Sequence, residues 1–235
     1  MPASFNIEAL KAQSIIARTY ALNLISKGNT LTDSSSIQKY IDTKEMQNIW
    51  SSNYQKYYNK VKEAVSSTKG LTIKYNGKYI DAVYHSTSKG YTEDSINVWN
   101  NNIPYLKSVD SVWDKNATSY LREKNLSLEE FNRILGINIS NQEDIEILSK
   151  TVSGRIDKIK LGDTIFTGLE LRTFLNLRST DFDIEINENN VSITTRGYGH
   201  GVGLSQYGAN GMANNGYDYK QILEHYYQNT TLEKI

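Results

Sequence analysis

Mostly apolar residues run from about position 7 to position 25 and define the first predicted element. Asn6 precedes this run and Glu8 falls in its first turn, which together are typical of a helix start. We therefore predict a mostly buried helix over residues 7–26. Weaker helical patterns follow at about 41–50, 54–65, 118–136, 169–175, 206–216 and 219–227.

Alternating apolar and polar residues predict strands in two places. Residues 71–83 alternate around Asn76-Gly77, a dipeptide typical of two-residue hairpin turns. Residues 145–193 form a longer strand-rich block with a second hairpin turn near Asn189-Asn190. The chain therefore mixes helices with strands that pair through tight turns.

Two charged residues interrupt the apolar pattern of the first helix. Lys11, Ser14 and Arg18 follow one another at spacings of three and four, so they share one line along the helix. Burying Lys or Arg without a partner costs on the order of several kcal/mol. We expect this line to face water or a polar cleft.

Residues 196–211, RGYGHGVGLSQYGANG, have glycine at six of sixteen positions. In an extended chain the four alternating glycines would leave one face bare, while Arg196, Tyr198 and His200 would line the other. Such a strand suits close approach by a ligand or a second backbone; a tight loop with positive φ is the alternative. We favour the extended form, because Arg, Tyr and His alternating with glycine are unusual in a loop. Nucleotide-binding glycine motifs do not fit this spacing.

A second polar segment, YHSTSKGYTE at 84–93, follows the first predicted hairpin. Polar residues at a strand end are a usual position for a site, although His, Ser and Thr neighbours also occur in ordinary turns. We predict an α+β fold of two interleaved parts. A discontinuous helix-rich part, 1–144 with 194–235, carries the cleft, and 145–193 form the strand-rich part.

Composition narrows the possible partners. Lys plus Arg equals Asp plus Glu at 26 each, so we expect no nucleic acid partner. The chain has no cysteine, and its first 30 residues lack the pattern of a signal peptide. We expect any membrane anchor or export signal to lie outside this chain.

Three segments together resemble one family. EALKAQSIIARTYAL at 8–22, the segment at 84–93, and the block from GRIDKIKLGDTIFTGLELRTFLNLRSTDF at 154–182 into 196–211 are similar to the SpoIID/LytB family, in the family's order. The resemblance implies a lytic transglycosylase that cuts peptidoglycan glycan strands stripped of stem peptides during forespore engulfment in sporulation. It also implies a sporulation amidase and a membrane partner in an engulfment complex, an extracytoplasmic location, and a membrane anchor in the full-length protein.

The implied reaction leaves 1,6-anhydro-N-acetylmuramic acid ends and needs one carboxyl group as acid and then base. No metal or other cofactor is expected. The residues that match the family pattern at the cleft are, as catalytic residues, Lys11, Arg18, His85 and His200, and, as substrate-binding residues, Ser86, Thr87, Ser88, Arg196, Tyr198, Gln206 and Tyr207.

The chain departs from the family pattern at two positions. The family's catalytic Glu directly precedes the Met-Pro that here is Met1-Pro2, so we expect that acid upstream of this sequence. Lys89 stands where the family usually has glycine. Glu8 and Glu93 are the acidic residues nearest the motifs, but neither is predicted to be the catalytic acid.

Three other functions stay open from the residues alone. A non-catalytic peptidoglycan-binding module would use the same cleft. A hydrolase would activate Ser86 or Ser205 through a histidine, but neither a GxSxG elbow nor a third orienting acid at a recognisable spacing is present. A zinc enzyme would have only three histidines and no cysteine to draw on, with His85 and Glu93 as possible ligands.

Overall fold

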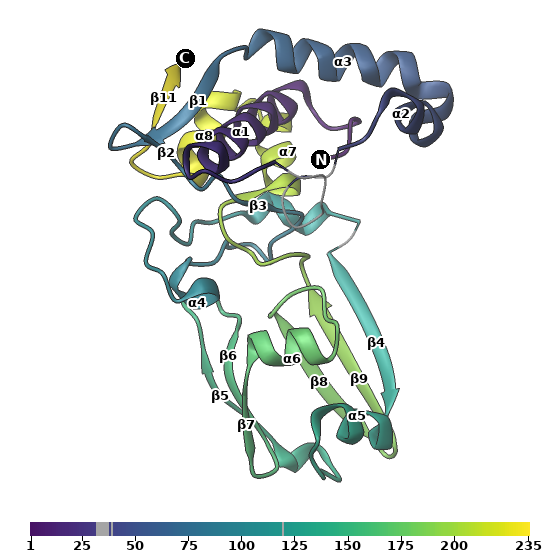
Figure 1. Ribbon diagram of the computed structural model, residues 1–235. Coiled ribbons are helices and arrows are strands. Elements are labelled where there is room, and N and C mark those ends of the chain that lie inside the picture. Colours follow the sequence, from purple (N-terminus) through teal and green to yellow (C-terminus); the bar gives the residue numbers. More distant parts are fainter. Residues whose placement is uncertain (32–37, 39, 119) are drawn as a thin grey trace. The chain divides into compact units, whose positions relative to one another are not determined.

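The computed structural model describes residues 1–31, 38, 40–118 and 120–235, and it is a mixed α+β structure, as the sequence predicted (Figure 1). Part of the polar run at 28–36 lies outside the described residues. Chain contacts divide the protein into unit 1, Met1–Val83 with Ala209–Ile235, and unit 2, Tyr84–Gly208. These boundaries differ from those expected from the pattern, because 84–144 and 194–208 share a unit with 145–193.

Unit 1 is built around its first helix. Its elements are α1 (Ile7–Ser26), α2 (Thr43–Trp50), η1 (Ser51–Asn53), α3 (Tyr54–Ser67), β1 (Leu71–Tyr75), β2 (Lys78–Tyr79), α8 (Tyr219–Tyr226) and β11 (Thr231–Lys234). Helix α1 packs against α3, β1 and α8, and β1 lies between β11 and β2 in an antiparallel sheet. The unit therefore depends on elements from both ends of the chain.

Local sequence explains where the unit 1 elements begin and turn. Asn6 caps α1, because its side chain accepts a hydrogen bond of 3.0 Å from the backbone N–H of Glu8. Asn76 and Gly77 have φ values of 48° and 75°, as the predicted two-residue hairpin turn requires. The predictions of this helix and this hairpin are confirmed.

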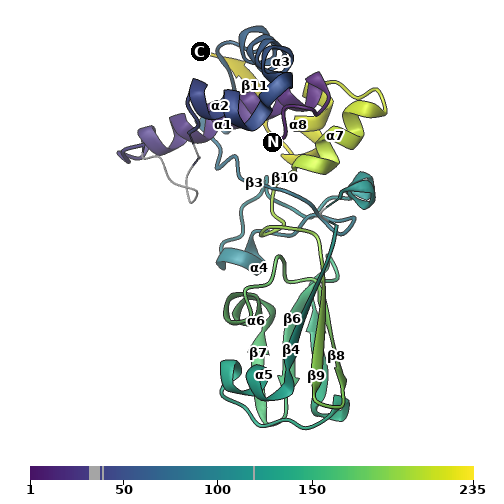
Figure 2. The same ribbon diagram turned by 90° about the vertical axis from the view of Figure 1, so that its right-hand side faces the viewer.

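Unit 2 contains two three-stranded antiparallel sheets, ordered β4-β9-β8 and β5-β6-β7. Its elements are β3 (Tyr84–His85), α4 (Ile96–Trp99), η2 (Val112–Asn116), β4 (Leu121–Ser127), α5 (Leu128–Leu135), η3 (Gln142–Asp144), β5 (Ile145–Lys150), β6 (Ile156–Leu161), β7 (Thr164–Thr167), α6 (Gly168–Phe174), β8 (Phe182–Asn187), β9 (Asn190–Arg196) and β10 (Leu204–Ser205), and α7 (Gln206–Asn214) begins in it. Helix α6 packs on β6 and β7, and α5 packs on β4 and β9 (Figure 2). Both sheets and both helices contribute side chains to one buried core that includes Phe131, Leu171 and Val191.

The helix predicted over 118–136 is only partly present. Residues 121–127 form strand β4, which pairs along its whole length with β9. The helix starts afterwards, where the side chain of Ser127 accepts a hydrogen bond from the backbone N–H of Glu130, and it ends at Gly136 with φ of 66°. Pairing with residues 63 to 75 positions further along the chain decides the structure of 121–127, and local periodicity does not reveal such a partner.

The extended form predicted for the glycine stretch is wrong, and the loop alternative is right. Strand β9 ends at Arg196, and the four following alternate glycines, at 197, 199, 201 and 203, have φ values of 77°, 117°, 85° and 69°. Residues with positive φ cannot continue a strand. No helix within the described ranges is both long and apolar enough to cross a membrane.

Candidate active site

The polar segment at 84–93 and the glycine stretch lie side by side in unit 2. The backbone N–H groups of Ser86 and Thr87 both donate to the carbonyl of Tyr198, at 3.1 Å each, and the N–H of Tyr198 donates to the carbonyl of Thr87 at 2.8 Å. Further along, strands β3 and β10 pair in parallel, with His85 opposite Ser205. The structure thus brings together two of the three motifs that carry the family resemblance.

Glycine is needed where these two segments touch. A Cβ added at Gly197 would lie 2.7 Å from the carbonyl oxygen of Thr87, and one at Gly199 would lie 2.7 Å from the Cβ of His85. Real side chains do not approach this closely, so the absence of side chains lets one backbone rest on the other. The close approach of a second backbone, which the many glycines led us to expect, is therefore present, although the glycine stretch is a loop and not a strand.

Both histidines of the site have both ring nitrogens occupied. His85 donates from Nδ1 to the carbonyl of Val202 at 3.2 Å, and its Nε2 accepts from the hydroxyl of Ser88 at 2.6 Å. His200 donates from Nε2 to the carbonyl of Tyr84 at 3.0 Å, and its Nδ1 accepts from the N–H of Val202 at 3.1 Å. Because a carbonyl can only accept, these partners fix one neutral tautomer for each ring.

The electrostatic surroundings keep both rings neutral. Burial, and then the neighbouring His200 and Arg155, hold the pKa of His85 well below its usual range. Burial, and then Arg172, lower the pKa of His200 to about 4. At neutral pH neither ring carries a proton that it could donate as a general acid, so the geometry favours a role in positioning the glycine loop.

A buried ion pair fastens the polar segment to the loop between β5 and β6. The carboxylate of Glu93 accepts hydrogen bonds from the hydroxyls of Thr151 and Ser153, at 2.6 Å and 2.7 Å, and lies 3.9 Å from Nη1 of Arg155. Glu93 and Arg155 are each 2% exposed. Since its other oxygen accepts from the backbone N–H of Asp94 and the amide of Asn97, the Glu93 carboxylate has no site left for a substrate proton.

Arg155 also explains why residue 201 is a glycine. A Cβ at Gly201 would lie 2.8 Å from a guanidinium nitrogen of Arg155. The guanidinium therefore lies directly against the glycine loop and connects it to Glu93. The sequence analysis did not single out Arg155. This residue belongs to the strand-rich block, and only the folded structure brings it into contact with Gly201.

A second buried carboxyl, Asp114, was also missed. Burial raises its pKa to about 6, against the opposing effect of hydrogen bonds from the hydroxyls of Ser111 and Ser205, both at 2.6 Å. Ser205 contacts this acid directly and is fully buried, and so is Ser88, the partner of His85. Ser86, the other serine that a hydrolase would use, is partly exposed, but the ring nitrogens of both histidines already bind other groups. The arrangement therefore does not support a serine hydrolase.

The remaining predicted residues are divided between the two units. In unit 2, Arg196 forms ion pairs with Asp181, at 3.2 Å, and with Asp183. Tyr207, next to Gln206 at the start of α7, has its hydroxyl 3.2 Å from that of Thr118.

In unit 1, Lys11 pairs with Glu8 at 2.7 Å. Arg18 donates from Nη1 to the carbonyls of Thr68 and Leu71, at 2.9 Å and 2.8 Å, so it ties α1 to the end of α3 and to β1. The functional roles of these residues stay predictions.

Two exposed aromatic residues belong to the same part of unit 2. Tyr198 is 47% exposed and Trp99 is 44% exposed, and the Trp99 ring centroid lies 5.2 Å from that of His200. The guanidinium of Arg178 lies 5.0 Å from the centre of the Tyr198 ring. Exposed aromatic faces next to polar groups suit sugar rings. Arg178 falls in the LRST sequence at 177–180, a part of the resembling block that carried no predicted role.

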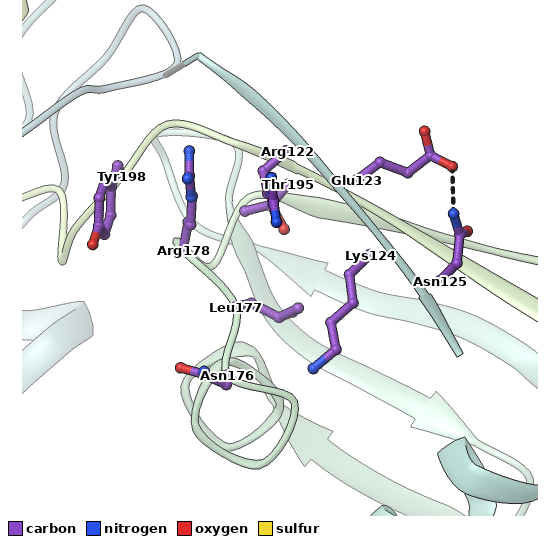
Figure 3. Close-up of a pocket in the computed structure, with 9 residues that line it drawn as sticks. All are labelled: Arg122, Glu123, Lys124, Asn125, Asn176, Leu177, Arg178, Thr195 and Tyr198. Atoms are coloured by element: carbon purple, nitrogen blue, oxygen red, sulfur yellow. Dashed lines mark hydrogen bonds between the residues drawn. The ribbon is translucent and has the colours of Figure 1, made fainter. Parts of the chain in front are cut away.

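Tyr198 and Arg178 form one end of a pocket of about 570 Å³ (Figure 3). Its other lining residues are Arg122, Glu123, Lys124, Asn125, Asn176, Leu177 and Thr195. In the part of the chain that the structure describes, no three His, Asp or Glu side chains gather as a metal site would require.

Comparison with known proteins identifies the family of this chain. A family model described as "Stage II sporulation protein" (SpoIID) matches residues 1–75. Stage II sporulation protein D of Bacillus subtilis is 37% identical over 243 residues, which cover all of this chain and 71% of the relative, and the Bacillus amyloliquefaciens protein of the same name matches equally well. An amidase enhancer of B. subtilis is 31% identical over 293 residues, or 99% of this chain and 39% of that protein. The chain belongs to the SpoIID family.

Proposed function

We propose that this protein is a peptidoglycan lytic transglycosylase that acts in forespore engulfment during sporulation. Its substrate is the glycan strand from which an amidase has removed the stem peptides. The observation that carries the proposal is the pairing of the segment at 84–93 with the glycine loop, next to exposed aromatic residues, in a chain of the SpoIID family. This arrangement offers a sugar polymer the partly exposed Ser86 and the exposed aromatic faces of Tyr198 and Trp99.

The reaction needs one carboxyl group. It protonates the glycosidic oxygen as the bond to C1 breaks, and it then takes the proton of the muramic C6 hydroxyl as that oxygen bonds to C1. Water takes no part, so the product ends in a 1,6-anhydro ring. The neutral His85 and His200 cannot supply the first proton, and Glu93 is buried and fully hydrogen-bonded. The family pattern has a Glu directly before the Met-Pro that here is Met1-Pro2, and we propose that this Glu is the acid.

The cellular setting follows from the same proposal. Stripped strands require an amidase upstream of this protein, and one relative bears the name amidase enhancer. We propose that the protein works outside the cytoplasm with this amidase and with a membrane partner, and that a membrane anchor belongs to the full-length protein. No cofactor is required by the proposed chemistry.

One observation favours a second candidate, a peptidoglycan-binding module without activity. The buried carboxylates of the site, Glu93, Asp114 and Asp181, are all engaged with hydroxyls or cations of the protein. A protein with no free carboxyl group in its cleft would hold glycan without cutting it.

Mass spectrometry of the products from stripped glycan strands separates the two candidates. The protein is extended upstream to include the residue preceding Met1. Anhydromuramyl ends that disappear when this residue is changed to Gln, but persist in the exposed control Lys158→Gln, would support the transglycosylase. Absence of such ends, with glycan binding that is retained and then lost in His200→Ala, would establish the binding module instead.

A further inference from the structure

The pocket next to Tyr198 is rich in positive charge. Arg122 and Lys124 come from β4, where residues two apart share one face of the sheet, and Arg178 comes from the loop after α6. Figure 3 shows Arg178 between Tyr198 and Arg122. The acidic residue of the lining, Glu123, is engaged at its Oε1 by the amide of Asn125 at 3.0 Å. The other eight lining residues include no further acid.

These three cations differ from three others of unit 2 that are held in ion pairs. Arg196, Lys89 and Arg155 are paired with Asp181, Asp183 or Glu93. Among the described residues, no acidic group lies within ion-pair distance of Arg122, Lys124 or Arg178. Lys124 donates to the backbone carbonyl of Leu175 at 2.7 Å, and Arg178 lies against the Tyr198 ring. A cationic side chain that has no acidic partner in the folded protein can pair with an anionic ligand.

The chemistry of arginine limits the kinds of anion that this pocket could bind. A guanidinium presents its N–H groups in a planar fork that matches a carboxylate or a phosphate, and the proposed glycan substrate carries carboxylates. Stacking against the Tyr198 ring restricts the guanidinium of Arg178 and so reduces the entropy that binding would otherwise cost. The pocket is therefore suited to a carboxylate carried by a ligand that also reaches Tyr198.

Resting on the proposed function, we infer that this pocket binds the lactyl carboxylate of muramic acid. In an intact strand this carboxyl is consumed in an amide bond to the stem peptide. Its negative charge exists only after the amidase has hydrolysed that bond. Arg122 and Arg178 would thus distinguish stripped strands from peptide-bearing ones by charge, and Lys124 would add to the positive field.

The test measures equilibrium binding of fluorescently labelled stripped strands in two forms. One form keeps its free lactyl carboxylates, and in the other they are converted to uncharged methylamides. We expect the native protein to bind the free form about tenfold more tightly, the size of effect typical of one charge-assisted contact. In the double variant Arg122→Gln/Arg178→Gln, affinity for the free form should fall to that for the methylamide form.

The controls make the result specific. The double variant Arg133→Gln/Lys158→Gln removes two exposed cations of the same unit outside the pocket and should keep the tenfold difference. Binding of the methylamide strand should be the same in all three proteins, which shows that the variants are folded. Equal affinity of the native protein for both forms would overturn the inference, as would an equal loss of affinity for the free form in both double variants.

This binding test is independent of turnover. If no anhydromuramyl ends form but the native protein still prefers the free carboxylates, the transglycosylase proposal fails and the inference stands. If the ends form and the two strands bind equally, the inference alone fails.

Discussion

His200 holds its place through two backbone groups and stays uncharged to do so. Its pKa in the folded protein is about 4, below the value of 6.5 for a free imidazole, chiefly because of burial. Below pH 6.5 the unfolded chain therefore takes up a proton that the folded chain does not. The stability that His200 contributes is present above pH 6.5 and is lost as the pH falls through about 4.

The variant His200→Gln should remove this pH dependence. Between pH 7 and pH 4.5 we expect the free energy of unfolding of the native protein to fall by about 2–3 kcal/mol more than that of the variant. Denaturant titrations at the two pH values measure the difference. Asp114 acts in the opposite direction, since its raised pKa favours the folded state as the pH falls through about 6, but it is common to both proteins. Equal pH dependence in both would contradict the neutral assignment of His200.

Gly199 allows a test of the contact between the two segments. Alanine here would have φ of 117° and its Cβ would lie 2.7 Å from that of His85. Gly90 has nearly the same φ, 118°, with nothing within 4 Å of an added Cβ. We expect Gly199→Ala to be less stable than Gly90→Ala by about 1–3 kcal/mol, the usual range for overpacking. Thermal or denaturant unfolding of both variants gives this difference, and equal losses would mean that backbone conformation alone requires the glycine.

At the scale of elements, the β5–β6 loop supports the site through Glu93. The variant Glu93→Gln keeps the size of this side chain but leaves the buried Arg155 without its acid. Breaking such a pair costs about 3–5 kcal/mol. The exposed Glu146→Gln on β5 is the matched control and should change stability by less than about 0.5 kcal/mol. Denaturant unfolding gives the free energy of unfolding of each variant. A loss in the Glu93 variant no larger than in the control would show that the Glu93–Arg155 pair does not hold the β5–β6 loop in place.

Elements with local signals were predictable from sequence. Helix α1 has its cap at Asn6, and α8 has one at Asp218. Strand β4 and the glycine loop were mispredicted because distant partners determine them: β4 pairs with β9, and the loop is shaped by contacts to His85 and Arg155. The resemblance placed the segment at 84–93 and the glycine stretch at one cleft, and the structure pairs their backbones. The roles of Arg155, Asp114 and Arg178 depend on their burial and on their neighbours in space. Neither can be inferred from the spacing of residues along the chain.

At the scale of the whole molecule, the chain leaves unit 1 at Val83 and re-enters it at Ala209. The two crossings are neighbours, because β3 and β10 pair in parallel. Unit 2 has its own core and sheets, whereas β1 of unit 1 needs β11, and α1 needs α8. We expect a fragment of residues 84–208 to unfold cooperatively by circular dichroism. A fragment of 1–83 should gain stable structure only when 209–235 is supplied, and a stable 1–83 alone would contradict this dependence.

This arrangement sets an order of events when the unfolded chain folds. Residues 84–208 contain every element of the unit 2 core, so this unit can form before residues 1–83 meet residues 209–235. Complete domains generally fold as units. The apolar residues of helix α1 stay exposed until α8 packs against them, so this segment is the one most open to aggregation or to a chaperone while unit 2 is already folded.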